Sequence, residues 1–204
     1  MGFGLVFIGY LFMFSFTPYG FDILPDIVGF GIAFLGVKGL ADYGCGWDIL
    51  KKYFLVLFPA SFITFVIQVL GVIKPDTFQI PFWSFIYEAV IFFYNILLFV
   101  AIYKIAEDVE MRSIKIKAQR NMIMGVIYFV IGILLKLPVP AVQKVVNLLK
   151  TRYAAGALFY LYGYVWLFLN LAVIFSCYMW ICAQGDEDMP MKERKQRPKR
   201  NEDE

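Results

Sequence analysis

Six apolar stretches, joined by more polar connections, constrain the fold of this chain more than any other feature. A stretch of about 17–25 mostly apolar residues is long enough to cross the hydrocarbon core of a bilayer as an α-helix. We therefore predict an all-α, polytopic transmembrane helix bundle within residues 1–182, with six spans at about 3–19, 23–40, 54–73, 83–106, 122–137 and 154–182.

The composition favours a membrane environment over water. Hydrophobic residues make up 61% of the 204 residues and charged residues only 17%, whereas soluble domains are about half apolar and about a quarter charged. A soluble domain of this size leaves much of its surface in water, so it could not bury the excess of apolar residues. The lipid bilayer is therefore the first expected partner of the chain.

The distribution of basic residues predicts the orientation. If the N-terminus lies inside, fourteen of the nineteen Lys and Arg residues fall on the cytoplasmic side, as the positive-inside rule requires. We expect three helical hairpins with both termini inside (N-in/C-in). Each hairpin turns outside, and each outer connection carries two prolines: Pro18 and Pro25, Pro75 and Pro81, and Pro138 and Pro140.

Two segments fall outside the six spans. Residues 140–152 place apolar side chains on one face and polar or basic ones on the other, which predicts an amphipathic helix at the outer interface. The same segment could instead extend the sixth helix as a bent arm. Residues 183–204 are charged and lack apolar periodicity, so we expect a disordered cytoplasmic tail. Acidic residues flank its basic run, which favours a topological role, and no nucleic-acid partner is expected.

Glycines seven residues apart occur in four of the six spans. Seven residues are nearly two helical turns, so each pair marks one face on which a neighbouring backbone can approach closely. We interpret these faces as helix-packing surfaces in preference to hinges for transport. The pairs are Gly2 and Gly9, Gly29 and Gly36, Gly125 and Gly132, and Gly156 and Gly163, the last continued by Asn170.

Polar residues inside the apolar spans are the candidate functional residues. Glu88 is the only acidic residue well inside a span, Asn95 lies seven residues beyond it, and Gln68 belongs to the preceding span. One hypothesis is a cation or proton site in the outer leaflet, built on Glu88 and completed by Asp26 and Gln68. The alternative, which we favour, is that Glu88 pairs with Lys136 or extends toward the interface, and only fixes helix packing.

Asp22 and Asp26 stand four residues apart at the start of the second span. Carboxylates at a helix N-terminus cap free backbone N–H groups and complement the helix dipole. We favour this capping role over a cation site formed by the two carboxylates.

The same region carries a family resemblance. The stretch from Phe21 to Phe30, FDILPDIVGF, resembles a D-I-L-P-D-x-x-G-aromatic motif between the first two helices of small, uncharacterised multi-pass membrane proteins of Gram-positive bacteria. The resemblance covers roughly residues 9–46. It implies a helical membrane protein from a Gram-positive source, and so the bacterial cytoplasmic membrane, and it implies no activity.

Enzyme signatures are absent from the sequence. The chain has no His, which removes the commonest general base and a common metal ligand. It also has no P-loop, nucleophile-elbow or zincin motif, and its three cysteines form no C-x-x-C pair. We therefore expect no enzymatic activity, no metal and no cofactor.

Three functions from different classes are compatible with these residues. The first, which we favour, is a non-enzymatic membrane component that acts through helix packing with other membrane proteins or in a homo-oligomer. The second is a small ion- or proton-coupled transporter or channel subunit, and the third is a lipid-acting membrane enzyme, for which no motif speaks. A continuous polar cavity lined by Gln68, Glu88 and Asn95 would favour transport, whereas closed packing of these side chains would favour the first function.

Overall fold

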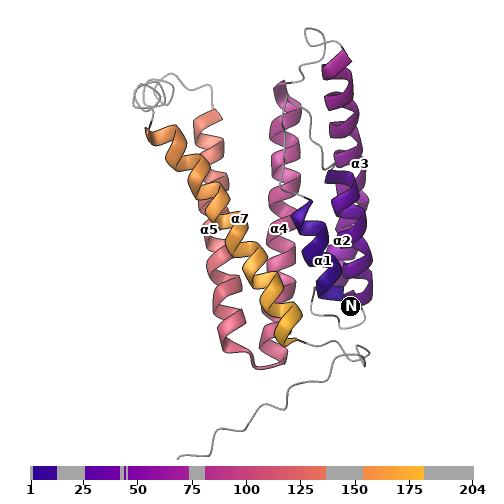
Figure 1. Cartoon of the computed structure of the whole chain (residues 1–204), viewed down its shortest axis with the longest axis vertical. Helices are drawn as coiled ribbons and strands as arrows, with labels where there is room; N and C mark the ends of the chain where they lie inside the picture. Colours follow the sequence, from indigo (N-terminus) through magenta and orange to yellow (C-terminus); the bar gives the residue numbers. More distant parts are fainter. Residues whose placement is uncertain are drawn as a thin grey trace, which may run out of the picture.

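The structure is a computed structural model that describes residues 2–12, 26–41, 44, 46–73, 81–136 and 154–181. Within these residues the chain is all-α, so the predicted helical bundle is confirmed. The helices, labelled as in Figure 1, are α1 (Gly2–Leu11), α2 (Asp26–Leu40), α3 (Trp47–Ile73), α4 (Pro81–Asp108), α5 (Arg112–Lys136) and α7 (Ala154–Trp180).

Four of these helices are long and apolar enough to cross a membrane. The candidate spans are Trp47–Leu70, Trp83–Asp108, Arg112–Leu134 and Leu161–Trp180. α1 and α2 have ten and fifteen residues, and at a rise of about 1.5 Å per residue neither described helix matches a hydrocarbon core of about 30 Å. By the length and composition of its longer helices, the chain is a membrane protein.

Two helices begin earlier than the apolar stretches predict. α3 begins at Trp47 rather than at residue 54, and α5 begins at Arg112 rather than at residue 122. Both added segments are basic, and Lys and Arg are good helix formers. Consequently α4 connects to α5 through only the short turn Val109–Met111. Hydrophobicity predicts which part of a helix suits lipid, and the helix itself can continue beyond that part.

The helices form a closed ring, in which each one packs against the next along the chain and α7 returns to α1. In Figure 1, α5 and α7 form a pair on one side, α1, α2 and α3 lie on the other, and α4 stands between them. The N-terminus, the α4–α5 turn and the last turn of α7 lie at the same end of the bundle. Successive helices therefore run in opposite directions, as hairpins require.

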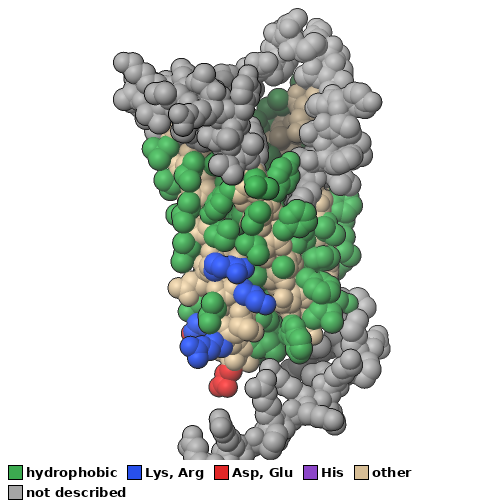
Figure 2. Space-filling view, turned by 60° about the vertical axis from the view of Figure 1, so that its left-hand side comes forward, with side chains coloured by type: hydrophobic (Ala, Val, Ile, Leu, Met, Phe, Trp, Pro, Cys, Tyr) green, Lys and Arg blue, Asp and Glu red, His purple; other side chains and the backbone are tan. Residues whose placement is uncertain are grey.

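Basic side chains collect at this same end of the bundle. They are carried by the last two turns of α2 and α4, by the first two turns of α3 and by the first three turns of α5. Figure 2 shows the Lys and Arg side chains of the α5–α7 side gathered toward the lower end, with hydrophobic side chains covering the face above them. The set is Lys38, Lys51, Lys52, Lys104, Arg112, Lys115, Lys117 and Arg120.

The core between α2, α3 and α4 is aromatic. Phe30, Phe54 and Tyr94 are buried, and the Tyr94 ring meets the Phe30 ring edge to face at 5.5 Å and the Phe54 ring at 5.7 Å. Edge-to-face contacts between rings add about 0.5–1.5 kcal/mol to the gain from burial. This cluster fixes one face of α4 and directs the next residue, Asn95, toward α1.

Several predicted features lie outside the described residues. They are the amphipathic helix at 140–152, the tail at 183–204, residue Asp22, residues 21–25 of the sequence motif, and the prolines of the outer connections other than Pro81.

Candidate functional site

A buried chain of hydrogen bonds joins four helices. The Tyr10 hydroxyl on α1 donates to Asn95 Oδ1 on α4 at 2.6 Å and accepts from Asn170 Nδ2 on α7 at 2.8 Å. Asn170 Oδ1 in turn accepts from Asn121 Nδ2 on α5 at 3.0 Å. All four side chains are at most 2% exposed. We call this set of residues the asparagine–tyrosine network.

The remaining polar groups of Asn95 and Asn121, at the two ends of this network, also have hydrogen-bond partners. Asn95 Nδ2 donates to the Ile91 carbonyl at 2.9 Å, within α4. The backbone carbonyl of Asn121 accepts the indole N–H of Trp166 at 2.9 Å, and the side-chain oxygen of Asn121 accepts from the Arg120 guanidinium at 3.2 and 3.3 Å. An unpaired buried polar group costs about 1–3 kcal/mol. The network therefore favours the one arrangement of helices that pairs its members.

The α5–α7 interface places each glycine whose surroundings are described opposite an aromatic ring. A Cβ atom added to Gly125 would lie 2.7 Å from Trp166 Cζ2, and one added to Gly163 would lie 3.0 Å from Tyr128 Cε2. Gly132 faces the Phe159 ring in the same antiparallel register, at 3.8 Å. Asn121 and Asn170 form the next facing pair along this interface. The glycines thus make room for side chains of the other helix.

The α1–α2 interface instead places glycine opposite glycine. A Cβ atom on Gly9 would lie 2.5 Å from the Gly29 carbonyl oxygen, and one on Gly36 would lie 2.6 Å from the Gly2 carbonyl oxygen. Here the two backbones touch, an approach that a side chain at any of these positions would prevent. Gly156, which its spacing predicts to lie on the same kind of face, is in the first turn of α7, where the surroundings of the side chains are not described.

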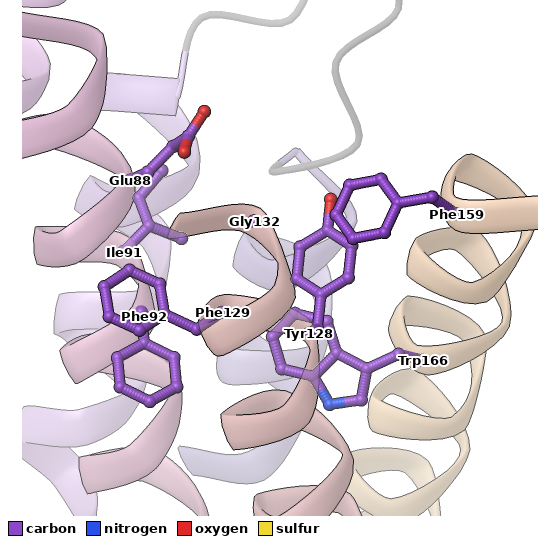
Figure 3. A pocket seen from close by; sticks show the side chains of 8 residues that line it. All are labelled: Glu88, Ile91, Phe92, Tyr128, Phe129, Gly132, Phe159 and Trp166. Atoms are coloured by element: carbon purple, nitrogen blue, oxygen red, sulfur yellow. The ribbon is translucent and has the colours of Figure 1, made fainter. Parts of the chain in front are cut away.

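An open pocket of about 260 Å³ lies beside the network, between α4, α5 and α7. Its inner end is shared with the network: Ile91 and Trp166 line the pocket and also bond to Asn95 and Asn121, respectively. Figure 3 shows Glu88 on the α4 side, with its carboxylate pointing away from the rings. The lining residues are Glu88, Ile91, Phe92, Tyr128, Phe129, Gly132, Phe159 and Trp166.

The residues of the predicted cation site belong to three helices, with Asp26 on α2, Gln68 on α3 and Glu88 on α4. Asp26 heads α2 and accepts a hydrogen bond from the Tyr87 hydroxyl at 2.5 Å, and Gln68 is half-buried on α3. Among the described residues that line the Glu88 pocket, neither Asp26 nor Gln68 appears. The side chain of Lys136 lies outside the described part of the chain, so its predicted ion pair with Glu88 stays a prediction.

Tyr10 and Asn121 are the members of the network that no sequence pattern given above predicts. Asn121 directly follows a basic run, where a polar residue is expected at the interface, and Tyr10 is one of thirteen tyrosines. A signal for Asn121 exists in the spacing of the chain. Asn, Gly, aromatic and Gly residues stand at positions 121, 125, 128 and 132. Read backwards from residue 170, the segment 159–170 has Asn, aromatic, Gly and aromatic residues at the same spacing, as an antiparallel pair requires.

Three hydroxyl groups of the described helices are hydrogen-bonded within their own helices. The hydroxyls of Ser61, Thr64 and Ser176 donate to carbonyls of their own helices, at 3.0, 2.9 and 2.7 Å, so none of these bonds joins a nucleophile to a base. Within the described residues there is no group of three or more metal-ligating side chains. The chain matches no protein-family model, no curated protein and no solved structure.

Proposed function

We propose that this protein is a non-enzymatic, multi-pass component of a bacterial cytoplasmic membrane, and that it works by binding other membrane proteins or a second copy of itself within the bilayer. The observation that carries the proposal is the asparagine–tyrosine network, whose polar groups donate to and accept from one another. Side chains engaged in this way hold a scaffold together and leave little for transport or catalysis. The Gram-positive source implied by the D-I-L-P-D motif is part of the proposal.

The proposed topology has six crossings with both termini in the cytoplasm. In support, every described Lys or Arg except Lys136 lies at the end of the bundle that holds the N-terminus and the last turn of α7. Basic side chains concentrate on the cytoplasmic side of membrane proteins. Reporter domains fused after residue 204, and inserted between α3 and α4, test this topology. The first fusion should report the cytoplasm and the second the outside.

A small transporter is the second candidate, and the position of Glu88 beside an open pocket is the observation in its favour. An ionisable residue at membrane depth commonly marks an ion or proton path. Against this candidate, the pocket ends at the network, where Asn95 is 2% exposed and hydrogen-bonded at both ends of its amide. Gln68 does not join the pocket among the described lining residues. These side chains support a closed bundle.

Flux measurements on the purified protein separate the two candidates. The protein is reconstituted into vesicles that contain a pH-sensitive dye, and proton and cation gradients are applied in turn. We expect no more flux than in empty vesicles, for the wild-type protein and for the matched variants Glu88→Gln and Asn95→Leu. A protein-dependent flux that Glu88→Gln abolishes would overturn the proposal in favour of transport.

The binding role is tested by cross-linking in intact membranes, followed by mass spectrometry. The chain alone has a mass of 23.6 kDa. We expect cross-linked species above this mass that contain another membrane protein or a second copy. Recovery of the 23.6 kDa monomer alone, over a range of cross-linker lengths, would contradict the binding role.

A further inference from the structure

Four basic residues lie on the first three turns of α5, and their surroundings differ. Arg112 and Lys115 line an open hollow together with acidic residues of the α4–α5 connection, and Lys115 forms an ion pair with Glu107. Lys117 and Arg120 lie further along the helix, where both side chains are exposed. Arg120 is about 12 Å beyond Arg112 along the helix axis, at a rise of ~1.5 Å per residue, and therefore inside the candidate membrane span of α5.

The positive charges of Lys117 and Arg120 have no negative partner among the described residues. The Arg120 guanidinium donates two hydrogen bonds to Asn121 Oδ1, a neutral amide oxygen that orients it and leaves its charge and its other N–H groups available. The sequences of α5 and α7 contain no acidic residue. A cation at membrane depth is costly unless an anion pairs with it, so these two residues favour an anion from outside the chain.

The exposed side of α5 becomes apolar directly beyond Arg120. Lys117, Arg120, Met124 and Ile127 follow one another at steps of three or four residues, so they share one side of the helix. Ile127 is 46% exposed, and Ile123, one turn before it, is 54% exposed. The stretch from Arg120 to Ile127 is about 10 Å long, within the ~15 Å of hydrocarbon that one leaflet provides. A basic end followed by an apolar stretch of this length matches the headgroup and acyl chain of a phospholipid.

The asparagine–tyrosine network fixes the position of Arg120. The same Asn121 amide that accepts from the guanidinium donates to Asn170 on α7 at 3.0 Å. A guanidinium that is already oriented loses less entropy on binding, and its planar N–H groups match the oxygens of a phosphate. Figure 2 shows Lys and Arg side chains of the α5–α7 side at two heights, the upper ones with hydrophobic side chains around them.

We infer that Lys117 and Arg120 bind the phosphate of one anionic phospholipid, whose acyl chain lies along Met124 and Ile127 of α5. The lipid belongs to the leaflet at the end of the bundle that holds the N-terminus. Clusters of basic residues beside a transmembrane helix attract anionic lipids, and here two of them stand where the apolar side of the helix begins. The inference goes beyond the proposed function and is independent of it, because the site is built from one helix and needs no partner protein.

The test uses the delipidated full-length protein in detergent, with native mass spectrometry as the measurement. The probe is phosphatidylglycerol, and the matched ligand control is phosphatidylcholine with the same acyl chains, which has a phosphate but no net charge. We expect the first molecule of phosphatidylglycerol to bind at least fivefold more tightly than the first molecule of phosphatidylcholine. A smaller preference, or no preference, would overturn the inference.

Two double variants separate a defined site from general attraction to a basic surface. Lys117→Gln/Arg120→Gln removes both charges of the site and should weaken binding of phosphatidylglycerol about tenfold, because the charged hydrogen bonds to the phosphate are lost. Lys51→Gln/Lys52→Gln removes two charges from the start of α3, at the same end of the bundle, and should leave binding unchanged. Equal weakening in the two variants would overturn the site in favour of general attraction.

A single variant keeps the test valid if the loss of Arg120 disturbs the fold. Lys117 forms no hydrogen bond within the described part of the chain, so Lys117→Gln should unfold at the same temperature as the wild type. We expect it to bind phosphatidylglycerol about threefold more weakly, and Lys117→Arg, which keeps the charge, to bind it as the wild type does. Wild-type affinity in Lys117→Gln would overturn the role of this residue.

Competition with glycerol phosphate, which carries the phosphate without acyl chains, identifies the source of the anion. If the apolar stretch of α5 contributes to binding, glycerol phosphate displaces half of the bound phosphatidylglycerol only at a tenfold excess or more, and this is the result that we expect. Half-displacement by a smaller amount would mean that the site binds a soluble phosphate, and would overturn the assignment to a lipid.

Discussion

The α1–α2 and α5–α7 pairs share one sequence pattern and pack in two different ways. Both carry glycines seven residues apart. In α1–α2 the spaced glycines Gly9 and Gly36 face Gly29 and Gly2, and the backbones touch. In α5–α7 the described glycines Gly125, Gly132 and Gly163 each face an aromatic ring. The spacing of small residues thus identifies an interface, while the residue on the opposite helix decides whether the helices approach closely or interlock through side chains.

The difference bears on what each pair can do. Two backbones in contact leave no space for anything between them. Rings inserted above glycines stand out from their helix, and on α5–α7 they extend into the wall of the pocket, where Tyr128 and Trp166 are part of the lining. The close-packed pair therefore leaves no space between its backbones, and the ring-packed pair forms part of the wall of a pocket.

The largest expected effect comes from Gly9→Ala. The new methyl group would lie 2.5 Å from the Gly29 carbonyl oxygen and 2.6 Å from the Ala33 nitrogen, and backbone atoms cannot move aside as a side chain can. We expect the free energy of unfolding to fall by about 3 kcal/mol, measured by denaturant unfolding in mixed micelles. The control is Gly31→Ala, also on the α1–α2 hairpin, where a Cβ meets nothing within 4 Å. Equal effects of the two substitutions would refute the contact between backbones.

Asn170→Leu should have the next largest effect, because it removes the hydrogen bonds that join α7 to α1 and to α5. The Tyr10 hydroxyl would lose its donor, and Asn121 Nδ2 would lose its acceptor. We expect a loss of about 2 kcal/mol in the same unfolding measurement.

The control for Asn170→Leu is the double variant Asn121→Leu/Asn170→Leu, in which leucine side chains replace both amides of the pair. The double variant should lower the free energy of unfolding by less than the sum of the two single substitutions, with a coupling energy of about 1 kcal/mol. Strict additivity would show that the bond between the two asparagines contributes nothing.

Gly125→Ala should be milder than Gly9→Ala, although the added atom comes almost as close to its neighbour. The nearest atom, at 2.7 Å, is Cζ2 of the Trp166 side chain, and a ring can tilt where a backbone cannot. We expect a loss of about 1 kcal/mol. In a Trp166→Phe background, where that ring atom is absent, Gly125→Ala should not lower the free energy of unfolding any further. A loss as large as that of Gly9→Ala would erase the distinction between the two interfaces.

The smallest expected effects lie in two connections between helices, which differ in the type of residue that adopts a positive φ. The α2–α3 connection uses Gly44 and Gly46 at φ 64° and 93°, whereas the α4–α5 turn places Glu110 at φ 56°. Glycine adopts this left-handed conformation without strain, and other residues do so at a cost. We expect Glu110→Gly to raise the free energy of unfolding by about 0.5 kcal/mol and Gly46→Ala to lower it by about 1 kcal/mol. If Glu110→Gly instead lowered the free energy of unfolding, the entropy lost when the more flexible unfolded chain folds would outweigh the strain that glycine relieves.

The order of residues along the chain was sufficient to predict the helical membrane bundle and the regions of its longer helices. Apolar residues in long runs have one low-energy solution in lipid, because a helix pairs all of its own backbone groups. The glycine spacing also indicated, helix by helix, a face suited to close packing. These properties are local, and each can be read from a window of about twenty residues.

The sites depended on the tertiary structure. Tyr10 and Asn95 are 85 positions apart and Tyr10 and Asn170 are 160 apart, and nothing local in the sequence pairs them. Glu88 lies inside the candidate span Trp83–Asp108, but its neighbours on α5 and α7 depend on the register of two other helices. That register is set by which side chain enters which gap between helices, a choice made by packing across the whole bundle. The sequence alone therefore determined that this protein is a membrane helical bundle with close-packing faces, and only the tertiary structure decided which faces meet as backbone, which meet as rings, and where the pocket lies between them.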